Sequence, residues 1–140
     1  MLRNKQLRSR SRRYQNRLAV AVVELAVCLP LLALVLLGTV EACVMLQLQQ
    51  NLAVTAYEGA RIGILPGVDA SSVQLQCQML LDDRSINSST ITLDPADLST
   101  LNVGDLFTVT IDADCTANSV FGGIFYESKT MSESVVMRAE

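Results

Sequence analysis

The segment Leu25–Val40, with the sequence LAVCLPLLALVLLGTV, decides the architecture of this chain. It has 16 residues without a charge, and the apolar run extends to Leu18 and Leu46 if Glu24 and Glu41 are included. A membrane-spanning helix needs about 20 mostly apolar residues. At about 1.5 Å per residue the charge-free part reaches only about 24 Å. One or both glutamates are therefore expected at, or slightly inside, the edge of a bilayer.

Charged residues are distributed unequally around this segment. Residues 1–17 hold seven of the 11 basic residues and no acid, whereas the rest of the chain holds four basic and 14 acidic residues. Basic residues stay on the cytoplasmic side of a membrane span. The sequence thus predicts a single-pass membrane protein with a cytoplasmic N-terminus and an exported C-terminal part. A nucleic-acid partner is not expected, because the basic tail directly precedes an apolar run.

Two simpler interpretations compete with a functional span. A cleaved signal peptide also has a basic tail and an apolar core, and Val40-Glu41-Ala42 resembles a cleavage site. The apolar run here is longer than the roughly 7 to 15 residues of a signal peptide and has an acid near its start. The second alternative is a generic single-pass anchor in which Glu24 has no special role.

Glu24 needs a partner if it lies in the membrane, because an ionised carboxylate there costs several kcal/mol unless it is paired or protonated. Arg13 or Arg17 could supply the positive charge at the cytoplasmic headgroups, and so could a neighbouring subunit. Further along, Gly38 and Ala42 form a small-xxx-small pair that lets another helix approach closely. Small residues are also common in spans without such a role.

A helical stripe continues beyond the span. Its apolar positions recur at steps of three and four residues and are Leu48, Leu52, Ala56, Gly59 and Ile62. The pattern predicts one helix from about Arg13 to Gly63, ended by Pro66-Gly67. Glu58 and Arg61 are three residues apart and can pair on its surface, either as a solvated pair or with a docking role for Arg61.

The C-terminal part is predicted to be a small α+β unit of one helix and an antiparallel sheet. Asp69 can cap a helix that runs to about Asp83, and strands are expected at Ile91–Leu93, Leu106–Asp112 and Ser132–Arg138. Cys77 and Cys115 fall in this exported part, where an oxidising compartment would allow a disulfide. The alternative is a pair of unpaired core thiols.

Catalytic and metal-binding patterns are missing from the sequence. It has no histidine, CxxC pair, P-loop or GxSxG motif. The expectation is a protein that is not an enzyme and has no cofactor or metal site.

The N-terminal part resembles the TadE-like pseudopilins of the tight-adherence (Flp) pilus system. The stretches that carry the resemblance are RLAVAVVEL at 17–25, LPLL at 29–32, LGTVE at 37–41, QQ at 49–50, YEGAR at 57–61 and LPG at 65–67. The ending SVVMR at 134–138 is similar to the family's closing strand.

Several expectations follow from the resemblance. A prepilin peptidase would cut between Ala19 and Val20, which makes Glu24 the fifth residue of the mature chain and lets it pair with the freed α-amino group of a neighbouring subunit. Alanine stands where the family commonly has glycine. The expected partners are membrane lipid, other pilin-like or pilus-assembly subunits, and that peptidase.

The predicted organisation is a basic cytoplasmic tail at 1–17, a transmembrane segment at 18–46, a juxtamembrane helix at 47–66 and an exported domain at 67–140. The predicted function is that of a minor pilin or pseudopilin in a pilus or related secretion assembly. The alternative is a surface binding module, unrelated to pili, whose apolar segment only targets or tethers it.

Overall fold

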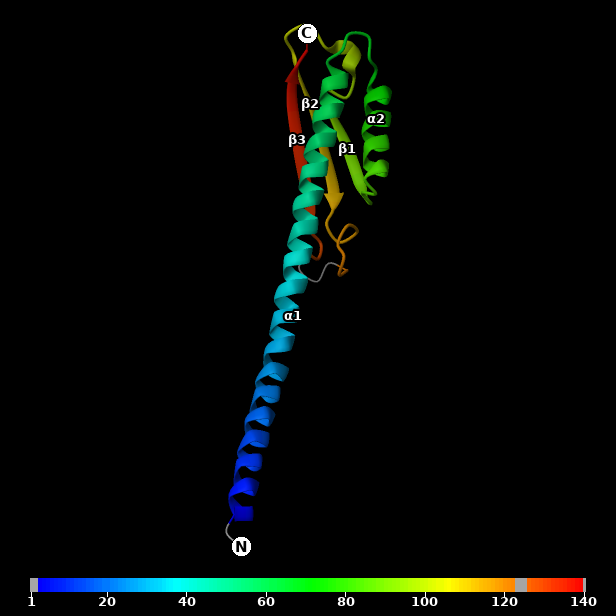
Figure 1. Cartoon of the computed structure of the whole chain (residues 1–140). Helices are drawn as coiled ribbons and strands as arrows, with labels where there is room; N and C mark the ends of the chain where they lie inside the picture. Colours follow the sequence, from blue (N-terminus) through cyan, green and yellow to red (C-terminus); the bar gives the residue numbers. More distant parts are fainter. Residues whose placement is uncertain (1–2, 123–125, 140) are drawn as a thin grey trace. The chain divides into compact units, whose positions relative to one another are not determined.

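The computed structural model describes residues 3–122 and 126–139, with side chains from Ala19 onward. The chain divides into two compact units, Met1–Val40 and Glu41–Glu140. Helix α1, Arg3–Gly63, contributes residues to both of them (Figure 1). Its end at Gly63 agrees with the predicted end, while its start lies ten residues before the predicted Arg13.

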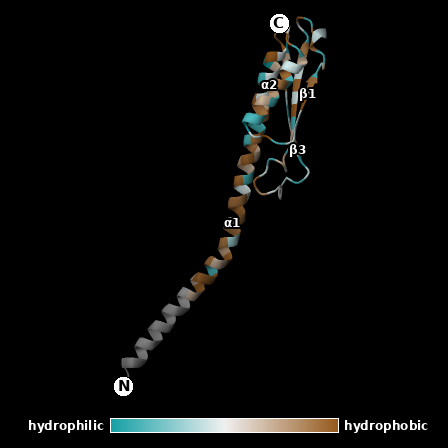
Figure 2. Ribbon diagram, turned by 90° about the vertical axis from the view of Figure 1, so that its right-hand side faces the viewer, coloured by the Kyte–Doolittle hydropathy of each residue, from teal (hydrophilic) through white to brown (hydrophobic). Residues whose placement is uncertain are grey.

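In the first unit the described side chains belong to an apolar helix. Most large apolar residues between Val20 and Val40 are more than half exposed, and Val27 reaches 71%. The hydropathy colours show this run of hydrophobic residues along α1 (Figure 2). Pro30 lies inside the helix and does not end it. Proline removes one backbone donor without stopping a helix whose flanking turns remain bonded.

The second unit has the predicted α+β fold. Helix α2, Ala70–Asp83, is followed by strand β1, Ser89–Asp94, the short 3-10 helix η1, Leu98–Thr100, and strands β2, Leu106–Asp114, and β3, Thr130–Arg138. The three strands form one antiparallel sheet in the order β1-β2-β3. Asp69 caps α2 as predicted, because its side chain accepts a hydrogen bond from the backbone N–H of Ser72.

The core lies between the sheet and the two helices. Alternate residues of β2 face it and are buried, namely Phe107, Val109, Ile111 and Ala113. Leu52 and Ala56 of α1 and Val73 and Leu81 of α2 are buried in the same cluster. Small residues let these layers approach: a side-chain carbon added at Gly63 would collide with the ring of Phe107. The predicted helical stripe is thus the face of α1 that packs on the sheet.

Candidate functional site

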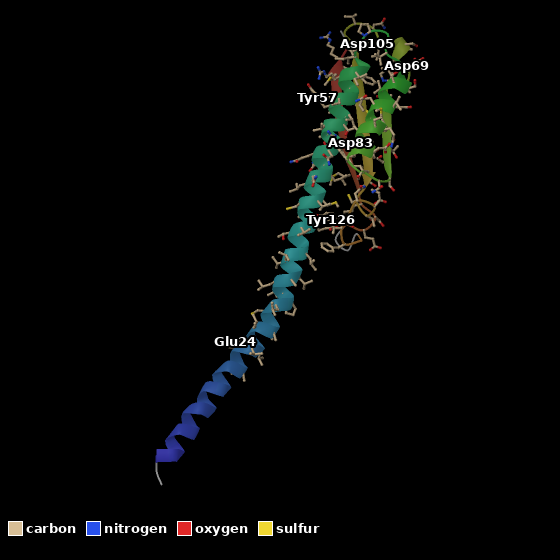
Figure 3. The ribbon with its side chains drawn as sticks, turned by 45° about the vertical axis from the view of Figure 1, so that its right-hand side comes forward. Glu24, Tyr57, Asp69, Asp83, Asp105 and Tyr126 are labelled. Atoms are coloured by element: carbon tan, nitrogen blue, oxygen red, sulfur yellow. The ribbon has the colours of Figure 1, made fainter. Side chains whose placement is uncertain are left out.

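The predicted processing residues and Glu24 lie on the exposed surface of α1. Ala19, Val20 and Glu24 are all exposed in the helix, and Figure 3 shows Glu24 on α1. The residues from Ala19 to Gly63 include a stretch long and apolar enough to cross a membrane. Glu24 makes no ion pair with any residue whose side chain the structure describes. The structure therefore presents this stretch with its apolar side chains uncovered.

Gly38 and Ala42 differ in their surroundings. A side-chain carbon added at Gly38 would meet nothing within 4 Å, so this position is open on the helix surface. Ala42, one turn later, is half-buried. Gly38 therefore leaves room for a closely approaching helix.

Glu41 is buried in the second unit, with only 1% of its surface exposed. Its Oε2 accepts a hydrogen bond from the backbone N–H of Val120 at 3.2 Å. Its Oε1 has no hydrogen-bond partner in the described part of the chain. Met45, one turn further, is also buried. On this face of α1, at the end of the predicted membrane segment, protein covers the helix.

The pair formed by Glu58 and Arg61 is a weak surface interaction. Arg61 Nη1 lies 3.9 Å from Glu58 Oε2, and the two side chains are 67% and 39% exposed. Pairs of this kind contribute at most a few tenths of a kcal/mol. They therefore add little to the stability of α1.

The predicted disulfide between Cys77 and Cys115 is absent, since both are free, buried thiols. Cys77 packs against α1 beside Gly59, at the level where Val109 of β2 also meets that glycine. Cys115 lies six residues beyond Val109, about 20 Å along the strand direction, whereas bridged Cα atoms lie about 4.4 to 6.8 Å apart. Burial raises the pKa of Cys77 to about 11. It therefore stays a protonated core thiol, the alternative that the sequence left open.

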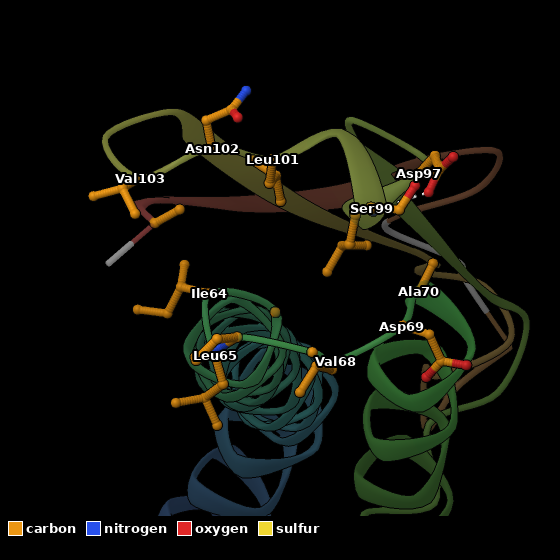
Figure 4. A pocket seen from close by; sticks show the side chains of 15 residues that line it. Ile64, Leu65, Val68, Asp69, Ala70, Asp97, Ser99, Leu101, Asn102 and Val103 are labelled. Atoms are coloured by element: carbon orange, nitrogen blue, oxygen red, sulfur yellow. Dashed lines mark hydrogen bonds between the residues drawn. The ribbon is translucent and has the colours of Figure 1, made fainter.

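A cavity of about 520 Å³, which no sequence pattern had indicated, lies at the end of the second unit (Figure 4). The turn between α1 and α2 forms one wall, and residues 97–103 with Ala139 form the other. Ala139 is held there by two backbone hydrogen bonds: its N–H donates to the Asp105 carbonyl, and the Gly104 N–H donates to its carbonyl, each at 2.9 Å. Only the folded chain brings these distant segments together, so spacing could not reveal the cavity.

Two aspartates on the rim of this cavity are already engaged in capping. Hydrogen bonds from the side chains of Ser71 and Ser72 lower the pKa of Asp69 to about 2. Hydrogen bonds from Ser99 lower the pKa of Asp97. Both carboxylates therefore serve the helices that they begin.

A second concavity, of about 180 Å³, was also missed. Arg84 lines it, together with residues of α1 and Asn118. Arg84 Nη1 donates to Thr55 Oγ1 at 2.8 Å and to the Asn51 carbonyl at 3.3 Å. Basic residues are rare in this acidic part of the chain, and this rarity is the one feature of the sequence that could have drawn attention to Arg84.

Comparison with known proteins gives one match. No curated protein and no solved structure matches the chain. The family model described as TadE-like protein matches residues 19–61, which comprise the exposed apolar helix and the part of α1 that enters the core. This match confirms the family resemblance, and it identifies residues 19–61 as a TadE-like segment.

Proposed function

We propose that the chain is a membrane-anchored minor pilin or pseudopilin of a tight-adherence type pilus or a related secretion assembly. Residues 18–46 insert as a helix, residues 1–17 stay in the cytoplasm and the α+β unit is exported. The protein acts by association of its helix with those of similar subunits and has no catalytic role.

One observation carries the proposal: the segment that matches the TadE-like family includes a helix whose large apolar residues are uncovered. Leaving this much apolar surface in water is unfavourable by about 25 cal/mol per Å². Lipid or other apolar helices must cover it. The family match favours pilin-like helices as its partners.

Glu24 fits the same proposal as a group that is paired during assembly. It lies among the exposed apolar residues of α1, where an unpaired carboxylate in lipid is costly. If a peptidase cuts between Ala19 and Val20, the new α-amino group lies four residues before Glu24. The amino group of one subunit then supplies the positive charge for Glu24 of the next.

The alternative of a cleaved signal fits α1 less well. Cleavage after Ala42 would remove Glu41, whose carboxylate accepts the hydrogen bond from Val120. It would also make Cys43 the first residue, only two residues before the buried Met45 and five before the buried Leu48. A signal peptide normally ends before the folded domain begins, whereas here the helix runs on into the core.

Sequencing the N-terminus of the protein purified from membranes tests the proposal. We expect a start at Val20, recovery in the detergent-soluble membrane fraction, and a shift to uncut chain in the Ala19→Lys variant. Leu18→Lys, one residue earlier, is the control for added charge. A start near Cys43 together with recovery in the aqueous fraction would contradict the proposal.

A further inference from the structure

A polar notch lies between α1, the end of α2 and the turn after β2. It is the concavity of about 180 Å³ described above. Its polar lining consists of Gln47, Asn51, Arg84, Ser85 and Asn118, and its other lining residues are aliphatic. None of the described residues that line it carries a carboxylate. We call it the Arg84 notch.

Arg84 has unused donors in this notch. Only its Nη1 makes hydrogen bonds in the described part of the chain, to Thr55 and Asn51. No carboxylate of that part lies within 4.0 Å of its nitrogens. A guanidinium has five N–H donors in a planar fork that matches the oxygens of a phosphate. The bonds through Nη1 fix the group in place, while Nε and Nη2 remain for a ligand.

Other donors of the lining are also available. The side chains of Gln47, Asn51 and Ser85 make no hydrogen bond within the residues that the structure describes. Asn118 differs, because its amide donates to the carbonyls of Asn87 and Asp114, each at 2.8 Å. It serves as a fixed wall. The notch thus offers one positive charge and several neutral donors without a competing acid.

The place of the notch along α1 matches the headgroup layer of a membrane. Its α1 residues run from Val44 to Asn51. They follow Glu41 by three to ten residues, or about 5 to 15 Å of helix. Headgroups extend roughly 5 to 8 Å beyond the hydrocarbon on each side. If the charge-free run lies in the hydrocarbon, lipid phosphates reach the Val44 end of the notch.

The charge of the second unit favours a ligand that is already at the membrane surface. From Glu41 onward the chain has 13 acidic and four basic residues, so dissolved anions are repelled overall. A lipid phosphate is held beside the notch by its own tails. Its interaction with Arg84 then needs only short-range attraction.

We propose that the Arg84 notch binds the phosphate of an anionic lipid headgroup. The proposal rests on the proposed membrane anchoring. The aliphatic residues beside Arg84 accommodate the glycerol part of the lipid, and the guanidinium and side-chain amides bind the phosphate oxygens.

Lipid retention by the full chain tests this proposal. The protein is purified in a nonionic detergent, mixed with equal amounts of phosphatidylglycerol and phosphatidylcholine, and examined by native mass spectrometry. We expect one retained phosphatidylglycerol in preference to phosphatidylcholine. Gln47→Glu places a carboxylate in the lining and should lower this retention about tenfold. Gln50→Glu adds the same charge one turn away, at an exposed residue outside the lining, and should have little effect.

A second measurement identifies the source of the phosphate. The protein is first placed in micelles of detergent alone. Added phosphatidylglycerol should then raise the midpoint of thermal unfolding, whereas inorganic phosphate added at the same concentration should not. Equal retention of the two lipids, equal effects of the two glutamate variants, or stabilisation by inorganic phosphate alone would overturn the assignment. Partition of the same sample into membranes is measured in parallel. If the protein enters membranes but does not prefer phosphatidylglycerol, only the assignment of the Arg84 notch is contradicted. If the protein stays in the aqueous fraction, the proposed membrane anchoring is contradicted as well.

Discussion

Among the single residues, Asp69 combines a structural role with a titratable charge. Its Oδ1 accepts a hydrogen bond from the backbone N–H of Ser72 at 3.2 Å, and its carboxylate also accepts from the hydroxyls of Ser71 and Ser72. These bonds lower its pKa from the ordinary value of 3.8 to about 2. The ionised form is therefore the one that stabilises the start of α2.

This lowered pKa predicts a loss of stability in acid. Because the folded pKa lies below the unfolded one, the contribution is complete above about pH 4 and is lost as the pH falls towards 2. Asp69→Ser keeps a capping oxygen that does not titrate. We expect the urea midpoint of this variant, in detergent, to fall less than that of the wild type between pH 4 and pH 2. Asp83→Ser, at the other end of α2, is the control and should follow the wild type.

The buried carboxylate of Glu41 gives a second prediction for a single residue. Glu41→Gln keeps an oxygen that accepts from the Val120 N–H and replaces the unpartnered carboxylate oxygen by an uncharged NH₂ group. The midpoint of thermal unfolding should therefore equal that of the wild type or lie above it. Glu41→Ala removes the acceptor and leaves a cavity, and should cost about 1 to 3 kcal/mol. Calorimetry of the full chain in detergent measures both. A glutamine variant as unstable as the alanine variant would show that the charge itself is required.

The elements show which features local sequence can predict. The three- and four-residue stripe and the Pro66-Gly67 turn were sufficient to place the end of α1 at Gly63. The strands were predicted in the right places but too short: β2 and β3 each extend two residues beyond the prediction, and β1 extends two residues before it and one after it. Alternation fades at the strand ends, where polar residues still pair across the sheet.

The error about the cysteines has a different origin. The spacing of Cys77 and Cys115 contains no information on the level at which α2 meets β2. Packing at Gly59 sets that level and places Cys77 beside Val109. The same limitation hid the cavity and the Arg84 notch, since each draws on three separate segments.

The contact of α1 with β2 predicts an unequal effect of two glycine substitutions. Gly63→Ala would place a carbon 2.8 Å from Cδ1 and Cζ of Phe107, and nearer still to Cε1. The overpacking should cost about 1 to 3 kcal/mol of unfolding free energy, measured with urea in detergent. Gly38→Ala meets nothing within 4 Å and should gain up to about 1 kcal/mol of helix stability. Equal behaviour of the two variants would contradict this packing.

For the whole molecule, charge and hydropathy divide the chain into parts suited to different surroundings. The basic tail, the uncovered apolar helix and the acidic α+β unit follow one another along the sequence. Composition alone was enough to predict this order. The burial of Glu41 and Met45 was not predictable in the same way, because their surroundings include residues far along the chain. Val120, which donates to Glu41, follows it by 79 residues.

The open position at Gly38 predicts an effect on association without an effect on folding. Gly38→Ile fills the space that another helix would use, while its own surroundings are empty within 4 Å. We expect weaker self-association of the full chain in lipid nanodiscs or by crosslinking, with an unchanged thermal midpoint of the α+β unit. Leu36→Ile, two residues earlier on an exposed position, is the matched control. Unchanged association in both would leave Gly38 without a role in assembly.

The attachment of Ala139 has a practical consequence for anyone who labels this protein. A fluorescent or affinity tag fused after Glu140 would begin two residues after Ala139, which lines the 520 Å³ cavity. Both the N–H and the carbonyl of Ala139 make backbone hydrogen bonds. A bulky fusion this close in sequence is expected to weaken the hydrogen bonds of Ala139 with Gly104 and Asp105. Insertion beside Glu127, which is exposed, lies outside the strands and does not line the cavity, keeps the reporter away from that closing contact.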